Sequence, residues 1–492
     1  MKQSMGVGTV YLMGAELIFI LSNYLIHIGV ARYLGTEAYG LFGLLLSLYL
    51  INRAFLNTGV PRAVSKFVSH SPEKRDSIFQ ISFKLQLLLA FIFALLYIIF
   101  ARNIAALLHD HSLTRYIVFL GVMVIPLALF SLQTSGYLNG LKLFREQALV
   151  KTIHAGARIV FTFLLVFLGW GIWGTLWGYL LAILAGLLIS WRFLKKKSAT
   201  LVESSYSKSF PVDSLISWEK ILAFALPITA ASLAFTLIRN VDVLFIKYFL
   251  ADNTLVAFYT AAFTLSTAPA MIFTTLPQVL MPSVSQAVAR NNLPLVQKYI
   301  SQSFRYTLLL LLPLTALVAV TSTKLLNLFY SSTYSVAGPV LSVLIVGSMF
   351  WSLFALLTSV TTGSGKPWIE MVLGILFLIM IVILDLLLIP QQGIIGAAYS
   401  FVITSFLALS LVSIYIYARY KTLLPWFSLA RITLGSVLVS LLAYFFPYQG
   451  LALVPLYAGL FLLYFLLLYL FGELEEEDFL VFKKMAGSVT KK

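Results

Sequence analysis

Residues 371–389 read MVLGILFLIMIVILDLLLI, nineteen consecutive residues with a single charge at Asp385. An α-helix rises 1.5 Å per residue, so this stretch is about 28 Å long and matches the roughly 30 Å hydrocarbon core of a bilayer. Similar apolar runs recur along the whole chain, and the connectors between them are too short to hold a soluble domain. The pattern predicts an all-α integral membrane protein.

The composition supports this prediction. Of 492 residues, 60% are hydrophobic and only 11% are charged, whereas a soluble domain carries roughly 25% charged residues. The absence of cysteine excludes disulfides and thiolate metal sites, and the five histidines lack zinc-site spacing. No loop is long enough for a catalytic domain. We therefore expect a protein that is not an enzyme and has no cofactor.

The apolar runs predict fourteen transmembrane helices, near residues 7–31, 38–60, 78–100, 116–139, 149–169, 171–193, 221–250, 254–281, 302–321, 337–361, 368–389, 394–417, 428–447 and 451–471. With this assignment, 25 of the 34 lysines and arginines fall on the side of the N-terminus and four on the opposite side. Loops rich in lysine and arginine stay on the cytoplasmic side of a membrane. The distribution predicts a multi-pass protein of the cytoplasmic (inner) membrane with both termini in the cytoplasm.

The net charge of +16 follows from the same loops. Because these basic residues flank membrane helices, we expect them to contact anionic lipids, and we expect no nucleic-acid partner.

Residues 195–220 contain a lysine run and a serine-rich run and are predicted to form a cytoplasmic linker. The linker separates an N-terminal lobe of six helices (1–194) from a C-terminal lobe of six helices (221–417). Short motifs between helices 1 and 2 reappear between helices 7 and 8, which predicts parallel repeats around a central cleft. Two further helices (418–471) and a cytoplasmic tail (472–492) follow, with the acidic residues from Glu473 to Asp478 expected in solvent.

Several motifs carry a family resemblance. Residues 32–42 read RYLGTEAYGLF and residues 55–69 read FLNTGVPRAVSKFVS, followed by Asn139-Gly140, Leu226-Pro227 and Phe258-Tyr259. In order and spacing the chain resembles the polysaccharide-transport (Wzx-like) flippases of the multidrug/oligosaccharidyl-lipid/polysaccharide (MOP) exporter superfamily. The resemblance implies translocation of a polyprenyl-pyrophosphate-linked saccharide from the inner to the outer leaflet. It implies as partners this lipid-linked substrate, membrane lipids and other membrane proteins of polysaccharide assembly. A MurJ-like lipid II flippase and a MATE-like cation-coupled exporter of small molecules remain alternatives.

Charged side chains inside apolar helices are the candidate site residues, because a charge at mid-bilayer costs about 2.5–3.5 kcal/mol and needs a cavity or a partner. Arg53 lies well inside the second predicted helix beside Asn52 and Asn57. Its guanidinium suits the pyrophosphate of the implied ligand, which it can bind with two parallel hydrogen bonds. Alternatively, Arg53 extends to the cytoplasmic headgroups. The same two interpretations apply to Arg158 in the fifth helix.

Arg239 and Asp242 lie three residues apart in the seventh predicted helix and share one face. They either form an ion pair, or Arg239 binds the ligand while Asp242 takes up a coupling cation, H+ or Na+. Glu16, near the middle of the first helix, is either a second coupling site or a partner of Arg53 or Arg239. Asp385 lies near the outer end of its helix, where solvation would explain it.

Overall fold

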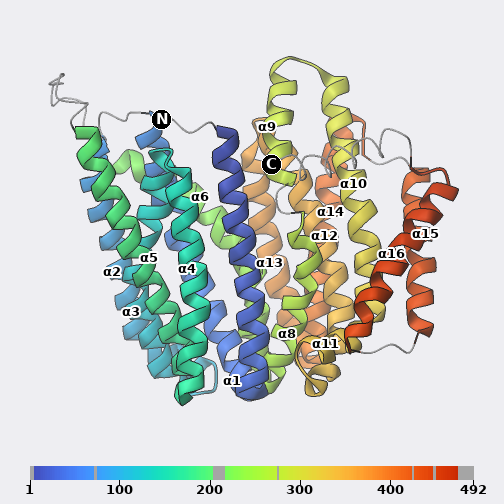
Figure 1. Ribbon diagram of the computed structural model, residues 1–492, viewed down its shortest axis with the longest axis horizontal. Helices are drawn as coiled ribbons and strands as arrows, with labels where there is room; N and C mark the ends of the chain where they lie inside the picture. The colour runs from blue at the N-terminus through green and yellow to red at the C-terminus, as the bar shows by residue number, and fades with distance from the viewer. Residues whose placement is uncertain are drawn as a thin grey trace. The chain divides into compact units, whose positions relative to one another are not determined.

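The computed structural model describes the backbone of residues 5–70, 75–202, 217–273, 276–423, 426–446 and 450–474 (Figure 1). Within these ranges the chain forms helices and no strands. The first group of helices is α1 (Met5–His70), α2 (Arg75–Leu107), α3 (Leu113–Ser131), η2 (Leu132–Leu138), α4 (Phe144–Leu165), η3 (Val166–Trp170), α5 (Gly171–Val202), α6 (Trp218–Ile238), α7 (Val241–Leu250) and α8 (Asn253–Met271). The second group is α9 (Leu276–Ala289), α10 (Leu293–Val320), α11 (Ser322–Phe329), η5 (Ser332–Ala337), α12 (Gly338–Gly363), α13 (Pro367–Gln392), α14 (Ile394–Tyr420), α15 (Trp426–Phe445), η6 (Gly450–Ala452) and α16 (Leu453–Leu470).

Helix α1 is two antiparallel helices joined at Gly35. Its 66 residues would form a rod about 100 Å long if it were straight. Gly35 has φ 81° and ψ 178°, a backbone conformation that glycine adopts without steric cost. His27 Nδ1 lies 2.8 Å from the hydroxyl of Tyr39, although twelve residues on a straight helix are about 18 Å apart. The chain therefore reverses at Gly35, and α1 crosses the membrane twice.

The segment from α4 to α5 reverses in the same way. Gly169 and Gly171 both have positive φ, at 85° and 54°. The guanidinium carbon of Arg158 on α4 lies 5.2 Å from the ring of Tyr179 on α5, which brings the two helices side by side. The described ranges hold twelve segments long and apolar enough to span a membrane, of which these two cross it twice. The predicted all-α membrane fold with fourteen passes is confirmed.

The seventh predicted helix is interrupted between α6 and α7. The amide side chain of Asn240 donates a hydrogen bond of 2.8 Å to the carbonyl of Thr236. That carbonyl would accept the backbone N–H of Asn240 in an uninterrupted helix, so the side chain competes with the helical bond. The interruption separates Arg239, which ends α6, from Asp242 in the first turn of α7.

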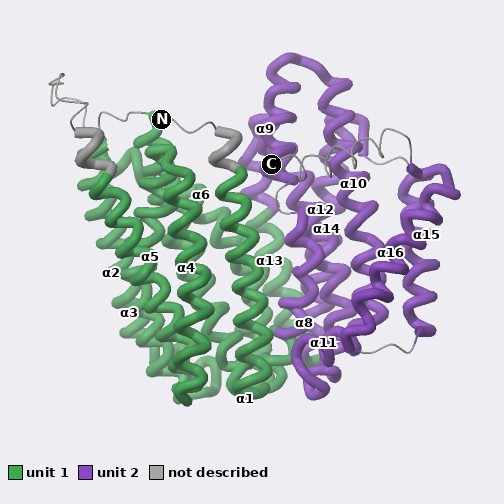
Figure 2. The backbone as a smooth tube through the Cα atoms, in the orientation of Figure 1, with its two compact units in different colours: residues 1–260, 374–393 green, residues 261–373, 394–492 purple. Residues whose placement is uncertain are grey.

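The chain divides into two compact units, residues 1–260 with 374–393, and residues 261–373 with 394–492 (Figure 2). In the first unit, α2 buries mainly small or polar residues, among them Ser82, Ala90 and Ala94. The same helix exposes large apolar residues such as Phe91 and Ile99. Small residues allow close helix packing, and large apolar residues suit lipid contact. The face of α2 that carries the large apolar residues is therefore the face turned toward the bilayer.

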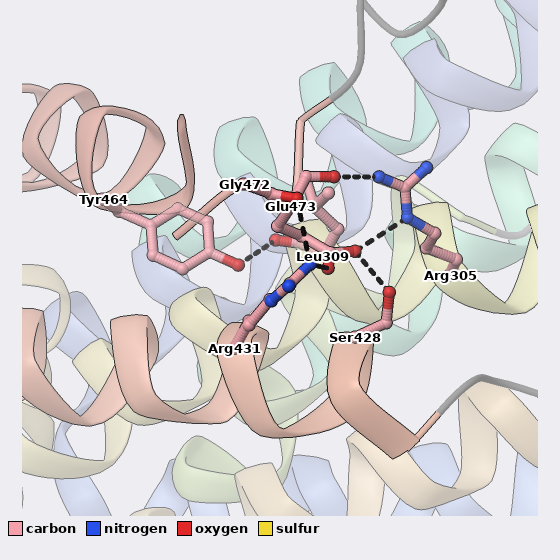
Figure 3. Close-up of polar contacts among 7 residues, drawn as sticks. All are labelled: Arg305, Leu309, Ser428, Arg431, Tyr464, Gly472 and Glu473. Carbon is pink, nitrogen blue, oxygen red and sulfur yellow. Dashed lines mark hydrogen bonds and ion pairs between the residues drawn. The ribbon is translucent and has the colours of Figure 1, made fainter. Parts of the chain in front are cut away.

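The second unit includes a core that α10, α12, α15 and α16 share, and in it Tyr464 donates a hydrogen bond of 2.8 Å to the carbonyl of Leu309. A polar cluster closes this core at the end of α16 (Figure 3). Glu473, expected in solvent, is buried there between Arg305 of α10 and Arg431 of α15. The expectation was wrong for Glu473, because neighbouring helices supply the positive charges that its burial needs.

The predicted linker falls only partly on described residues. Helix α5 continues to Val202 and α6 begins at Trp218, while 203–216 lie outside the described ranges. The described tail ends at residue 474. The lobe boundaries at 194 and 221, and the cleft between the lobes, stay predictions.

Candidate functional site

The first limb of α1 runs parallel to α4, with matching residues in register. Ser22 of α1 lies beside Arg158 of α4. Further along both helices, Phe163 meets Gly29, where a side chain would not fit. Because α1 reverses at Gly35, its second limb returns along the first, and Arg53 reaches the ring of Phe19. The glycine turn therefore brings two candidate residues from separate helical passes to one aromatic ring.

Two guanidinium groups share the ring of Phe19. The guanidinium carbon of Arg53 lies 4.9 Å from the ring centroid, and that of Arg158 lies 4.5 Å from it. Arg158 also lies over the ring of Tyr179, at 5.2 Å. Cations within about 6 Å of an aromatic face are attracted by its quadrupole, more strongly where water is excluded. We call Phe19, Arg53, Arg158 and Tyr179 the cationic cluster.

Arg158 is deeply buried and only partly hydrogen-bonded. Arg158 is 3% exposed. Its Nη2 donates hydrogen bonds to the Ser22 hydroxyl at 2.6 Å and to the Phe19 carbonyl at 3.5 Å. Its Nε has no hydrogen-bond partner within the described part of the chain. No carboxylate forms an ion pair with Arg53 or Arg158 in those same ranges. A buried cation that no anion neutralises is costly, and an anionic ligand would compensate for that cost.

Glu16 lies one turn of α1 away from Phe19, and it forms an ion pair with a lysine of α4. Its Oε2 lies 3.3 Å from Nζ of Lys151 on α4. Glu16 is exposed. One of the two interpretations of Glu16 expected it to pair with Arg53 or Arg239. In the structure its ion pair is with Lys151 instead.

Asn52 and Asn57 do not join the cationic cluster. Asn52 is buried, and its amide oxygen has no hydrogen-bond partner within the described ranges. The amide oxygen of Asn57 accepts hydrogen bonds from Ser131 and Ser135, on α3 and η2. Asn57 contributes to helix packing in this structure, and the role of both residues in ligand binding stays a prediction.

Arg239 lies elsewhere, near Tyr24 on the first limb of α1. It is half-buried and ends α6 with a hydrogen bond from its backbone N–H to the carbonyl of Thr236. Its predicted contact with the ligand stays a prediction.

Asp242 belongs to a separate, acidic group in the first unit. Its Oδ2 accepts a hydrogen bond from the hydroxyl of Tyr259 on α8, and Asp385 on α13 lies near both residues. Both carboxyl groups are completely buried. Two adjacent buried carboxyl groups are stable only if one of them is protonated or a cation lies between them. The expectation that Asp385 is solvated was wrong, because α13 packs this residue against α7.

Comparison with known proteins identifies the family. Residues 5–288 match the polysaccharide biosynthesis protein family, which is more than half of the chain. The chain belongs to this polysaccharide biosynthesis family. Over 332 residues it is 24% identical to the stage V sporulation protein B of Bacillus subtilis, a match that covers 63% of each chain. The chain thus spans less than two thirds of that relative's length.

The fold of this polysaccharide biosynthesis family member is shared with two groups of solved structures. One is the lipid II flippase MurJ in an inward closed conformation, with a TM-score of 0.74, 15% identity, and coverage of 94% of this chain and 98% of that one. The other is an inward-facing multidrug resistance MATE transporter of the MOP superfamily, with a TM-score of 0.71, 16% identity, and coverage of 82% and 94%. At these identities the likeness concerns the fold.

The sequence analysis missed several members of the site. Phe19, Ser22 and Tyr179 are ordinary residues of apolar helices, and nothing in the sequence distinguishes them from lipid-facing or core positions. Lys151, at the start of the fifth predicted helix, was not among the candidate residues. A signal for Lys151 and Arg158 does exist: they are seven residues apart, so they share a helix face, and that face is turned toward α1.

Proposed function

We propose that this chain is a flippase that translocates a polyprenyl-pyrophosphate-linked oligosaccharide from the inner to the outer leaflet by alternating access. The observation that carries the proposal is the cationic cluster, in which Arg53 and Arg158 share one aromatic ring and lack an ion-pair partner within the described ranges. Arginine binds phosphate with two parallel hydrogen bonds, and these bonds are strong where water is scarce. In this proposal the two guanidinium groups hold the pyrophosphate while the polyprenyl tail stays in lipid.

The membrane potential favours the proposed direction. Outward movement of a negatively charged headgroup gains about 2.3 kcal/mol per charge for each 100 mV of inside-negative potential. The family match and the fold shared with transporters support a carrier rather than an enzyme.

We further propose that Asp242 and Asp385 couple transport to a cation, H+ or Na+. Their buried carboxyl groups provide the oxygen ligands that a hard cation prefers, and a proton would serve the same purpose. Glu16 is a weaker coupling candidate, because Lys151 already compensates its charge.

Transport in cells tests the proposal. Arg53→Ala and Arg158→Ala should each abolish complementation of a strain that lacks its oligosaccharide flippase, at unchanged levels of protein in the membrane. Arg239→Ala tests the third predicted ligand contact in the same strain. Arg102→Ala, which changes an exposed arginine on α2, is the matched control and should complement fully. Full activity of both the Arg53 and the Arg158 variants would refute the proposal.

The same variants distinguish two alternative cargoes. Complementation of a strain depleted of its lipid II flippase, with the same dependence on Arg53 and Arg158, would assign lipid II as the cargo. Drug efflux that depends on Asp242 and Asp385, and tolerates loss of both arginines, would instead indicate a MATE-like exporter, which the buried acidic pair favours.

A further inference from the structure

Three residues of α1 meet three residues of α4 in sequence order. Glu16 pairs with Lys151, Phe19 stacks on His154 with 6.3 Å between ring centroids, and Ser22 accepts from Arg158. Lys151 and Arg158 are seven residues apart, which places them about 10 Å apart along the helix axis. Lys151 is the closer of the two to the start of α4 at Phe144, the end that the distribution of basic loops assigns to the cytoplasm.

The two ends of this row differ in how their charges are compensated. Arg158 lies deep in the protein and has no carboxylate partner within the described ranges, whereas Lys151 is held by Glu16. The side chains of Lys151 and Glu16 are 33% and 50% exposed. Ion pairs with this much exposure contribute little free energy, so a competing anion in solvent can separate them.

A phosphate group that approaches from this end meets Lys151 before it meets Arg158. To bind Lys151 it competes with the carboxylate of Glu16, which carries a single negative charge. A lipid phosphodiester, such as phosphatidylglycerol, also carries one negative charge and gains little from the exchange. A pyrophosphate carries at least two, so it attracts Lys151 more strongly than Glu16 does.

We infer that Lys151 is an entry-side binding residue for pyrophosphate, and that Glu16 is its displaceable counter-ion. This inference rests on the proposed function, because it presumes that a pyrophosphate lipid reaches Arg53 and Arg158. Because a singly charged phosphate gains little by displacing Glu16, Lys151 favours a pyrophosphate over the phospholipids around it.

Binding of two soluble probes to the purified full-length protein in detergent tests the inference. The probes are farnesyl pyrophosphate and dihexanoyl phosphatidylglycerol, measured by microscale thermophoresis on the parent, Glu16→Gln, Lys151→Gln and the double variant. Glu16→Gln should tighten binding of farnesyl pyrophosphate about two- to fivefold, the factor that corresponds to an exposed ion pair. It should tighten binding of phosphatidylglycerol by no more than that, because a singly charged phosphate gains less from the released Lys151.

The double variant separates displacement from simple repulsion. If Glu16 acts by occupying Lys151, Glu16→Gln has no effect on farnesyl pyrophosphate binding in the Lys151→Gln background. If Glu16 only repels anions, Glu16→Gln tightens binding of farnesyl pyrophosphate to the same extent with or without Lys151, and that result would overturn the inference. Lys298→Gln, which removes an exposed lysine on α10, controls for the loss of net charge and should leave both affinities unchanged.

The failure of this inference is distinguishable from failure of the proposed function. Arg53→Gln with Arg158→Gln should abolish binding of farnesyl pyrophosphate in the same assay. If that double variant binds normally, the proposed function is wrong. If it loses binding while the Glu16 and Lys151 variants show no coupling, only the entry-side role of Lys151 is wrong.

Discussion

The buried carboxylate of Glu473 should contribute more to the stability of the second unit than either of its arginine partners does alone. Its Oε1 accepts hydrogen bonds from Arg305 Nε at 2.8 Å and from the Ser428 hydroxyl at 2.6 Å (Figure 3). Its Oε2 lies 3.7 Å from Nη1 of Arg431. The side chain of Glu473 is 2% exposed, that of Arg305 is 16% exposed and that of Arg431 is 43% exposed. The pair with Arg305 is therefore buried, and the pair with Arg431 is largely solvated.

These exposures set the expected magnitudes. Removal of one partner from a buried ion pair leaves an uncompensated charge and costs about 3–5 kcal/mol, so Glu473→Ala should lower the unfolding free energy by about that much. Arg305→Ala should cost about 3 kcal/mol, at the low end of that range, because Arg305 keeps some solvent contact. Arg431→Ala should cost at most about 1 kcal/mol, since an exposed pair contributes little.

Unfolding in mixed micelles by titration with sodium dodecyl sulfate, followed by tryptophan fluorescence, measures these free energies. The result that matters is the ranking, with Glu473→Ala and Arg305→Ala well above Arg431→Ala. Glu473→Gln serves as a conservative variant that keeps one accepting oxygen, and it should fall between the two groups. Equal costs for the two arginine variants, or a neutral Glu473→Ala, would refute the reasoning from burial.

Three further predictions concern the first unit. Asp242→Asn and Asp385→Asn should each reduce the dependence of transport on the coupling cation, measured as uptake into everted vesicles at varied Na+ and pH; unchanged cation dependence in both would count against the acidic pair. Gly40→Ala should lower the unfolding free energy by about 1–3 kcal/mol, because an added Cβ would meet the backbone carbonyl of Asn253, whereas Gly14→Ala, with open space around it, should be neutral. Burial raises the pKa of Asp110 between α2 and α3, but hydrogen bonds from Ser112 and the charge of Lys247 outweigh it, and the net pKa lies below its ordinary value. The stabilisation by Asp110 is then fully present above its unfolded pKa of about 3.9 and lost as the pH falls through the lower folded pKa. Asp110→Asn should therefore cost about 2 kcal/mol at every pH from 5 to 8, and a cost that vanishes near pH 6 would contradict the assignment.

The fold was predictable from sequence because a bilayer tolerates few structures. Long apolar runs must form helices, and the basic loops then count the passes. The two glycine turns, at Gly35 and near Gly169, were also visible as short interruptions between predicted helices. The break between α6 and α7 was not, because it depends on one side chain, that of Asn240, taking a backbone acceptor from its own helix.

The site was predictable only as a set of separate candidates. An unexplained charge in an apolar helix marks Arg53, Arg158 and Asp242, but the sequence does not give the register of one helix against another. That register decides that Glu16 meets Lys151 and not an arginine, and that Asp385 is buried beside Asp242. The contact partners, and with them the division into a cationic and an acidic group, required the structure.

Arg53 and Arg158 share an aromatic ring, which suits a phosphate-binding position better than an acidic side chain would. A carboxylate between Arg53 and Arg158 would neutralise them and compete with any phosphate for the same hydrogen-bond donors. The ring of Phe19 attracts both guanidinium groups and carries no charged oxygen that would compete with a phosphate for their N–H donors. The same chain does use a carboxylate at Lys151, where the pair is exposed and exchange with solvent anions is possible. On this argument Phe19→Leu should weaken pyrophosphate binding although it removes no polar atom, and Phe19→Tyr should preserve it.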